Sequence, residues 1–309
     1  MAAHARAAAK NTGLAPGCAL TGDTRRLFHP RDKLTMVSPS ISTPTQYIRF
    51  AEELADASRK LIRARFRQGT DVEMKPDDTP VTRTDLEVEA LIREMIADRY
   101  PSHGIVGEEH PDSAAGADHV WVIDPIDGTR SFIAGRPVFG TLIALTVDTL
   151  PVLGVVDIPI MCERWVGAKG YPTLLNGEPA RTRRCGAAKG AILLATSPEY
   201  LDGDAAGPFG NVAEQAKFAI YDAGTQAYGL VASGHADIMI AARYGIVDYL
   251  AAVPVIEGAG GLMRDWKGAP LTLHSGDRFI AVGDPHLLVE ALQLLNPSET
   301  RSANHAEHA

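Results

Sequence analysis

The stretch that decides the fold is WVIDPIDGTRSF, residues 121–132. It begins with apolar residues that are typical of a buried strand, and it then places Asp124 and Asp127 three residues apart. Two carboxylates this close repel each other unless a positive charge lies between them. Because Mg²⁺ prefers carboxylate and carbonyl oxygens as ligands, the two aspartates and the Ile126 carbonyl indicate a metal site.

The residues that follow the aspartates suit a phosphate group. Gly128 allows the backbone to approach an anion closely, and a helix that begins at Thr129 would present free backbone N–H groups to it. The Thr129 hydroxyl could orient a water molecule. This combination indicates metal-assisted hydrolysis of a phosphate ester, although a turn capped by aspartates has the same letters.

Further acids lie at the ends of predicted elements. Asp85 is at the start of a predicted helix, Glu108 and Glu109 follow the predicted strand HGIVG, and Asp248 opens the predicted helix DYLAAVPVIEGAGG. Taken singly, Glu108 and Glu109 are typical of a solvated strand end, and Asp248 is typical of a helix N-cap. Together with residues 124–129, in this order along the chain, they predict a carboxylate cage for divalent cations.

The composition of the 309-residue chain excludes several classes of protein. Its net charge of −8 argues against binding nucleic acid through a basic face. No apolar run reaches the length that spans a membrane, so no membrane partner is expected. Cys18, Cys162 and Cys185 are scattered and odd in number, which predicts free thiols, no zinc site and a cytoplasmic location.

The spacing of apolar residues predicts the order of elements. A long amphipathic helix is expected between residue 43 and Gly69, and a second helix is expected to begin at Thr84, with Glu87 in capping-box spacing, and to end before Pro101. Short apolar strands joined by Gly/Pro turns then predict a largely antiparallel sheet. From about Gly190 onward strands and helices alternate.

This layout predicts two lobes of the α+β and α/β classes with a cleft between them. We expect a metal-binding α+β lobe over residues 43–187 and a C-terminal α/β lobe over residues 188–296. Residues 1–42 are expected to form a disordered extension, with a basic transit peptide and a segment upstream of a start at Met36 as alternatives. Residues 297–309 are expected to form a flexible tail.

Four landmarks connect the chain to a known family: PVTRTD (80–85), GEE (107–109), WVIDPIDGTRSF (121–132) and VDYLAAVPVIEGAGG (247–261). On these residues the chain resembles the inositol monophosphatase superfamily of Mg²⁺-dependent, lithium-sensitive phosphatases, over roughly residues 44–295. The resemblance implies a layered αβαβα sandwich of two lobes with the active site between them. It also implies a homodimer, a small phosphorylated metabolite as substrate, and two or three Mg²⁺ ions in each site.

The resemblance also implies roles for individual residues. Glu108, Asp124 and the Ile126 carbonyl would hold one ion, and Asp124, Asp127 and Asp248 would hold the second. Asp85 and Glu108 would border a weaker third ion.

The catalytic residues implied by the resemblance are Glu108 and Thr129, with Asp85 linked to Thr129; together they would activate the attacking water. Asp127, Gly128, Thr129 and Asp248 would bind the phosphate and the substrate. Lys75 matches a lysine near the mobile metal-binding loop of the family.

Details of the motifs bear on the substrate. Inositol monophosphatases commonly have Asn where this chain has Ser131, and a sugar-gripping Glu where it has Ala241. Both differences argue against inositol. The stretches DGTRSFIAGRPVFGTLIAL (127–145) and VPVIEGAGG (253–261) resemble instead the histidinol-phosphate phosphatase branch, which implies L-histidinol phosphate, with Asp222 and Asp248 as candidates to face its cationic groups. That branch, too, often has an acidic residue at the position of Ala241. That branch commonly has a Gly-Asp-Cys-like stretch where this chain has AGTQ (223–226). The alternatives are an inositol-1-monophosphatase, a 3′(2′)-phosphonucleotide phosphatase and, remotely, a non-enzymatic protein that binds phosphorylated ligands.

Overall fold

The computed structural model describes residues 43–69 and 71–297. The predictions for residues 1–42, and for the tail beyond residue 297, lie outside the described residues. No helix in the described part of the chain is long and apolar enough to cross a membrane.

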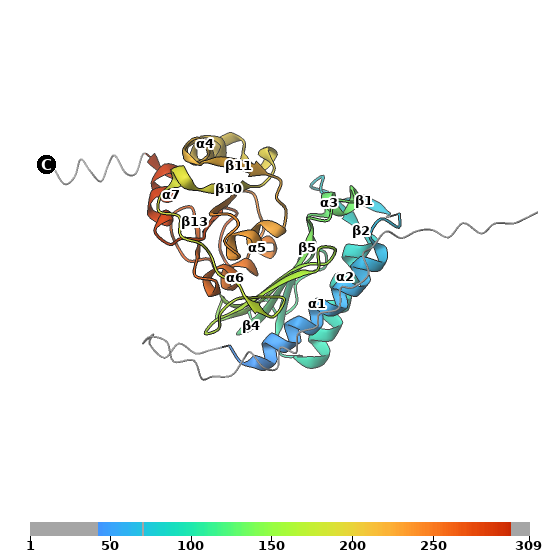
Figure 1. The fold of residues 1–309 in the computed structure, drawn as a ribbon. Helices are drawn as coiled ribbons and strands as arrows, with labels where there is room; N and C mark the ends of the chain where they lie inside the picture. Colours follow the sequence, from blue (N-terminus) through green and yellow to red (C-terminus); the bar gives the residue numbers. More distant parts are fainter. Residues whose placement is uncertain (1–42, 70, 298–309) are drawn as a thin grey trace, which may run out of the picture.

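The described residues form five alternating layers of helices and sheets (Figure 1). Helices α1 (Thr45–Arg65) and α2 (Arg83–Arg99) cover one face of a seven-stranded sheet. Helices α5 (Gln226–Ala232) and α6 (Ala252–Gly258) lie between this sheet and a five-stranded sheet. Helices α4 (Ala206–Gln215) and α7 (Leu287–Leu295) form the last layer. The predicted αβαβα sandwich is confirmed.

The seven-stranded sheet is largely antiparallel, as the hairpin-length turns predicted, and only β3 and β4 run parallel. Its strands occur in chain order across the sheet: β3 (Gly104–Gly107), β4 (His119–Asp127), β5 (Gly140–Val147), β6 (Leu150–Ile158), β7 (Glu163–Ala168), β8 (Leu174–Leu175) and β9 (Glu178–Pro179).

The five-stranded sheet is mixed. Strand β10 pairs in parallel with β11 and β12, whereas β14 pairs antiparallel with β12 and β13. Its order is β11 (Phe218–Tyr221), β10 (Ile192–Ala195), β12 (Ile238–Ala241), β14 (Phe279–Val282) and β13 (Leu262–Asp265). Strands β11 and β13 and helix α4 were not predicted from the sequence. The two strands have four residues each, and β11 is mostly exposed at the sheet edge. Helix α4 contains Gly207, Pro208 and Gly210, which are poor helix formers.

Three apolar cores hold the layers together. The apolar stripe of α1, including Leu54 and Ile62, packs with Trp121 beneath the large sheet. A second core, which contains Trp165 and Tyr228, fills the space between the two sheets, and a third lies under α4 and α7. Because the middle core includes residues of both predicted lobes, the two sheets share one interior; the division into domains stays a prediction.

Several short elements complete the described chain. The hairpin of β1 and β2 precedes α2, and helix α3 follows β4. The bounds of these short elements are β1 (Val72–Met74), β2 (Pro80–Thr82), α3 (Thr129–Ile133) and the 3-10 helices η2 (Ala188–Gly190), η3 (Pro198–Leu201), η4 (Gly203–Ala205) and η5 (Ile246–Asp248).

The start of α2 differs from the prediction. The capping box is formed by Thr82 and Asp85, not by Thr84 and Glu87. Thr82 has an extended backbone. Its hydroxyl accepts a hydrogen bond from the Asp85 N–H, and the Thr82 N–H donates to the Asp85 carboxylate at 3.0 Å. Glu87 instead forms ion pairs on the helix surface. The prediction failed because both threonines are followed three residues later by an acid.

Two further predictions were wrong. Asp248 does not open α6: it ends the 3-10 helix η5, and α6 begins at Ala252. The thiols are not all free, because Cys162 is disulfide-bonded, whereas Cys185 is free.

Candidate active site

A break in the regular pairing of β4 brings Asp124 and Asp127 together. In a regular strand, residues three apart point to opposite faces. The pairing of β4 with β5 shifts between Asp124 and Asp127, and a bulge of this kind re-aims side chains. Pro125 lies within the bulge, where a missing N–H costs no ladder bond, and the Thr141 hydroxyl donates to the Pro125 carbonyl at 2.9 Å.

Asp248 joins these two aspartates from a distant part of the chain. One carboxylate oxygen from each of Asp124, Asp127 and Asp248 lies within 4.8 Å of the other two. Asp124 is buried, and Asp127 and Asp248 are partly exposed. The Gly245 N–H donates to the Asp248 carboxylate at 2.6 Å, which holds this side chain in the loop before α6. We call these three residues the carboxylate cluster.

The carboxylate cluster is electrostatically strained. Burial, followed by the negative charges of Glu108, Asp127 and Asp248, raises the pKa of Asp124 well above its ordinary value. Burial raises the pKa of Asp127 to about 7, and the nearby Thr225 hydroxyl opposes the rise. Burial and the charges of Asp127 and Glu108 also raise the pKa of Asp248. Within the described residues, no lysine or arginine forms an ion pair with any member of the cluster.

Asp85 lies at the edge of the site but is already hydrogen-bonded. Its carboxylate accepts from the Thr82 N–H and hydroxyl on one oxygen and from the Thr129 hydroxyl, at 3.2 Å, on the other. Burial raises the pKa of Asp85, and these hydrogen bonds oppose the rise. The Thr129 hydroxyl also lies 3.1 Å from the Ile126 carbonyl.

Glu108 and Glu109 face Lys75 of the loop between β1 and β2. The Lys75 ammonium lies 3.0 Å from Glu108 and 2.8 Å from Glu109. Burial raises the pKa of Glu109 to about 7, and the hydrogen bond from Lys75 opposes the rise. Glu108 lies outside the trio of the carboxylate cluster, but its charge reaches all three members.

The turn after Asp127 has the form that the sequence predicted. Gly128 adopts the left-handed conformation, with φ of 87°, and α3 begins at Thr129. A Cβ atom at residue 128 would contact Phe139 at 3.4 Å, and any side chain would be strained at this φ.

Several residues that support the site were not singled out from the sequence. The buried Glu89 carboxylate accepts from the Glu109 N–H at 2.7 Å and thereby fixes the loop that carries Glu108. The Thr225 hydroxyl donates to the Asp127 carbonyl at 2.9 Å, and the Tyr228 hydroxyl donates to the Asp248 carbonyl at 2.7 Å. No local sequence signal marks these contacts, because each joins segments that are distant along the chain.

Asp222 and Ala241, which the sequence linked to the choice of substrate, differ in exposure. Asp222 is exposed and forms an ion pair with Arg136, so its charge is already balanced. Ala241 is buried at the end of β12 and offers no polar group.

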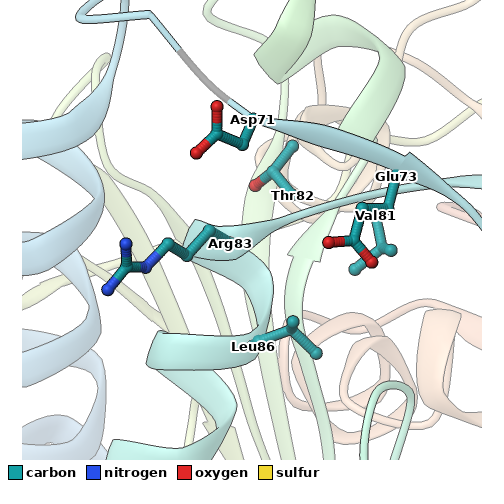
Figure 2. Close-up of a pocket in the computed structure, with 6 residues that line it drawn as sticks. All are labelled: Asp71, Glu73, Val81, Thr82, Arg83 and Leu86. Carbon is teal, nitrogen blue, oxygen red and sulfur yellow. The ribbon is translucent and has the colours of Figure 1, made fainter.

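A small pocket lies beside the site, between the β1–β2 hairpin and the first turns of α2 (Figure 2). None of the three aspartates of the carboxylate cluster lines it. Thr82, which caps α2 and binds Asp85, is its connection to the site. The lining residues are Asp71, Glu73, Val81, Thr82, Arg83 and Leu86.

The arrangement suits chemistry on an anionic substrate through divalent cations. The carboxylate cluster offers hard oxygen ligands whose mutual repulsion a cation would relieve, and the Glu108 carboxylate and the Thr129 hydroxyl lie at its border. The model of the inositol monophosphatase family matches residues 43–298. The chain belongs to the inositol monophosphatase family.

Relatives within this family carry different names. The chain is 41% identical over 277 residues to the chloroplastic bifunctional phosphatase IMPL2 of Arabidopsis thaliana, covering 86% of this chain and 80% of that protein. It is 36% identical over 232 residues to the histidinol-phosphatase of Chlorobaculum parvum, covering 72% of this chain and 87% of that protein.

A solved structure of an inositol monophosphatase from Zymomonas mobilis is also similar to this chain. It superposes with a TM-score of 0.74 at 41% identity and covers 81% of this chain and 98% of that one. Membership of the family identifies the protein as a phosphatase of phosphate monoesters. The names of the relatives leave the individual substrate open.

Proposed function

We propose that this protein is a Mg²⁺-dependent phosphomonoesterase that converts L-histidinol phosphate and water into L-histidinol and phosphate. The observation that carries the proposal is the carboxylate cluster. One oxygen from each of its three carboxylates lies within 4.8 Å of the other two, and no cationic side chain among the described residues forms an ion pair with them. A buried group of like charges is stable only when it is protonated or when it binds a cation.

The proposed metal ligands are Asp124, Asp127 and Asp248 for one ion and Glu108, Asp124 and the Ile126 carbonyl for another. Asp85 and Glu108 would border a third ion. Since Thr82 and Thr129 already donate to both Asp85 oxygens, any contribution of Asp85 to this third ion is expected to be weak. When bound, Mg²⁺ supplies charge neutralisation at the phosphate and lowers the pKa of a bound water.

The protein groups are proposed to orient the attacking water. The Thr129 hydroxyl has one hydrogen, which it directs toward Asp85 or the Ile126 carbonyl. Its oxygen lone pairs remain free to accept from water. Glu108 would accept the proton that this water loses when it attacks phosphorus. Gly128 and Thr129 would bind phosphate oxygens, and Asp127 and Asp248 would face the substrate.

The choice of histidinol phosphate rests on residue 241, where inositol monophosphatases commonly have a sugar-gripping Glu. Ala241 offers no hydrogen bond to a polyol, and a site discriminates hydroxyl groups through paired hydrogen bonds. The similarity to the histidinol-phosphatases of Chlorobaculum parvum and, at 32% identity, of Mycobacterium tuberculosis supports the same choice. Inositol 1-phosphate is the second candidate, because the similar structure from Zymomonas mobilis is named an inositol monophosphatase.

Phosphate release with Mg²⁺ tests the proposal. We expect kcat/KM for L-histidinol phosphate to exceed that for inositol 1-phosphate and for a 3′-phosphonucleotide by about tenfold or more, the range in which a pocket without paired polar groups discriminates. A higher value for either rival would replace the substrate. An absence of Mg²⁺-dependent release from all three esters would favour the non-enzymatic alternative.

The homodimer is also proposed on the resemblance to the family. Light scattering of the purified protein tests it, and a monomer at micromolar concentration would contradict it. The cytoplasmic location stays a proposal from the scarcity of cysteines, and the disulfide bond of Cys162 argues against it.

A further inference from the structure

The loop after β12 brings an aromatic ring next to the carboxylate cluster. Tyr244 immediately precedes Gly245, whose N–H donates to the Asp248 carboxylate at 2.6 Å. On the other side, Arg243 adopts a left-handed backbone conformation with φ of 62°. The Tyr244 N–H donates to the Asp277 carbonyl at 3.1 Å. The loop is therefore held at both sides of Tyr244, and the position of the ring is tied to that of Asp248.

Tyr244 lies on the loop that leads to Asp248 and packs against another aromatic ring. Its ring lies 5.8 Å from that of Phe279, and the residue is only partly buried. Burial, followed by the charges of Asp127 and Asp248, raises the pKa of Tyr244, and Tyr200 and Asp222 contribute as well. The phenol therefore stays neutral and lies among several negative charges.

Tyr244 differs from the other tyrosines near the cluster. The hydroxyls of Tyr228 and Tyr249 donate to backbone carbonyls, at 2.7 Å in both cases, and are part of the interior. No hydrogen bond of the Tyr244 hydroxyl is found within the described part of the chain. Because the residue is partly exposed, a ligand can reach this ring.

The Tyr200 ring lies next to that of Tyr244, and we call these two rings the aromatic wall. Tyr200, in η3, lies edge-on to Tyr244 at 6.2 Å, and the Arg130 guanidinium lies 5.9 Å from the Tyr200 ring centre. Arg130 follows Thr129 in α3 and forms an ion pair with Glu199 at 3.1 Å. This contact connects the start of α3 to the segment that carries Tyr200, so the aromatic wall is positioned from the phosphate side of the site.

Aromatic faces near negative charges favour a particular kind of ligand. Flat rings stack on tyrosine, and cations are attracted to its face. The buried Ala241, at the end of the strand that leads into this loop, supplies no carboxylate for ring hydroxyls. A polyol has no flat face to stack on these rings, whereas a planar or protonated ring would find a complementary surface.

We propose that Tyr244 and Tyr200 form the leaving-group subsite, and that this subsite selects phosphate monoesters whose alcohol carries a planar aromatic or cationic heteroaromatic ring. Tyr244 is the main specificity residue, and Arg130 is a positioning residue that acts through Tyr200. The proposal rests on the proposed phosphatase function and specifies which residues of the site distinguish one ester from another.

The test compares esters with and without a planar ring. For the full-length protein, kcat/KM is measured with L-histidinol phosphate, p-nitrophenyl phosphate and glycerol 2-phosphate in Mg²⁺. Tyr244→Leu should lower the ratio of either ring ester to glycerol 2-phosphate by about tenfold, the size expected for loss of an aromatic and cation contact. Tyr244→Phe, which keeps the ring, should recover most of the ratio.

Tyr47→Leu is the matched control. Tyr47 packs against Tyr100 and His119 at the opposite end of β4 from Asp127, so the ratio should equal that of the unmodified protein. Should Tyr244→Leu fail to fold, as judged by its melting curve, Tyr200→Leu gives the same comparison.

An equal loss on ring and non-ring esters in a folded variant would overturn the subsite. A preference of the unmodified protein for inositol 1-phosphate would reject histidinol phosphate as substrate. The ratio of kcat/KM for p-nitrophenyl phosphate to that for glycerol 2-phosphate would still decide the role of Tyr244. Failure of the proposed substrate and failure of the proposed subsite are therefore distinguishable.

Discussion

Asp157 and Asp124 are both buried aspartates on neighbouring parts of the large sheet, but their surroundings differ. Asp157 lies between Arg59, at 2.5 and 3.0 Å, and Arg164, at 2.6 Å, and all three residues are buried. Asp124 lies among Glu108, Asp127 and Asp248, which are all acids. Within the described residues, the first carboxylate has its counter-ions in the protein and the second has none.

This difference separates a structural carboxylate from one suited to bind an external ion. A buried charge is costly unless it is paired. At Asp157 the pairing joins α1 to β6 and β7 and requires nothing from solution. At Asp124 the neighbouring charges raise the pKa, so the folded protein stores repulsion that protons or cations relieve.

Asp124→Asn should have the largest effect on activity. It removes a proposed ligand of both ions, and we expect kcat/KM to fall by about a thousandfold or more, since metal contributions are worth several kcal/mol. The melting temperature measured in EDTA should stay equal or rise, because like charges are removed. Near-normal phosphate release by this variant would contradict the metal assignment.

Asp157→Asn should act in the opposite way. It leaves Arg59 and Arg164 without their buried counter-ion, which costs about 3 kcal/mol or more in free energy of unfolding. Chemical denaturation measures the loss, and the activity of the remaining folded protein should be unchanged. Arg65→Ala is the control, because its ion pair with Glu87 is exposed and should be worth less than about 1 kcal/mol. Equal losses in the two variants would remove the contrast.

The pH dependence of stability should reveal the unpaired cluster. The pKa of Asp127 is raised to about 7, compared with about 4 in the unfolded chain, so the folded state binds the proton more tightly. This contribution to stability is present below pH 4 and is lost as the pH rises through about 7. In EDTA, the melting temperature should therefore fall by several degrees between pH 5.5 and pH 8.

Mg²⁺ should reduce or reverse this slope, because it binds the deprotonated carboxylates and stabilises the folded state in proportion to its concentration. Thermal melts at both pH values, with EDTA or with Mg²⁺, measure the effect. The variant Asp124→Asn should respond less to both pH and Mg²⁺. A metal-free protein that is more stable at pH 8 than at pH 5.5 would contradict the electrostatic account.

Thr82→Ala should have the smallest effect on activity. It tests a third type of buried carboxylate, that of Asp85. Asp85 is held by hydrogen bonds rather than by ion pairs. Loss of the N-cap should cost about 1 kcal/mol of unfolding free energy and lower kcat modestly through Thr129. Thr84→Ala serves as the comparison, because Thr84 does not cap the helix. An equal loss from Thr84→Ala would argue against the observed capping box.

Part of the fold was predictable because the relevant signals are local. The apolar stripe of α1, the hairpin-length turns and the alternation after Gly190 each follow from short-range periodicity. The choice of Thr82 over Thr84 as cap did not follow, because both fit the same local pattern. Strand β11 was missed for a related reason: four residues at an exposed edge carry little periodicity.

For the candidate site, the sequence by itself determined which residues could do the chemistry. Asp124, Asp127, Gly128 and Thr129 are adjacent in the chain, and their ligand and turn properties depend only on residue type and backbone conformation. Only the tertiary structure decided that Asp248 lies within 4.8 Å of them and that Thr225 and Tyr228 hold the backbone. It also decided that Tyr244 lies beside the cluster while Asp157 is neutralised elsewhere. The physical reason is that local preferences act over a few residues, whereas these contacts arise from the packing of two sheets through a shared core.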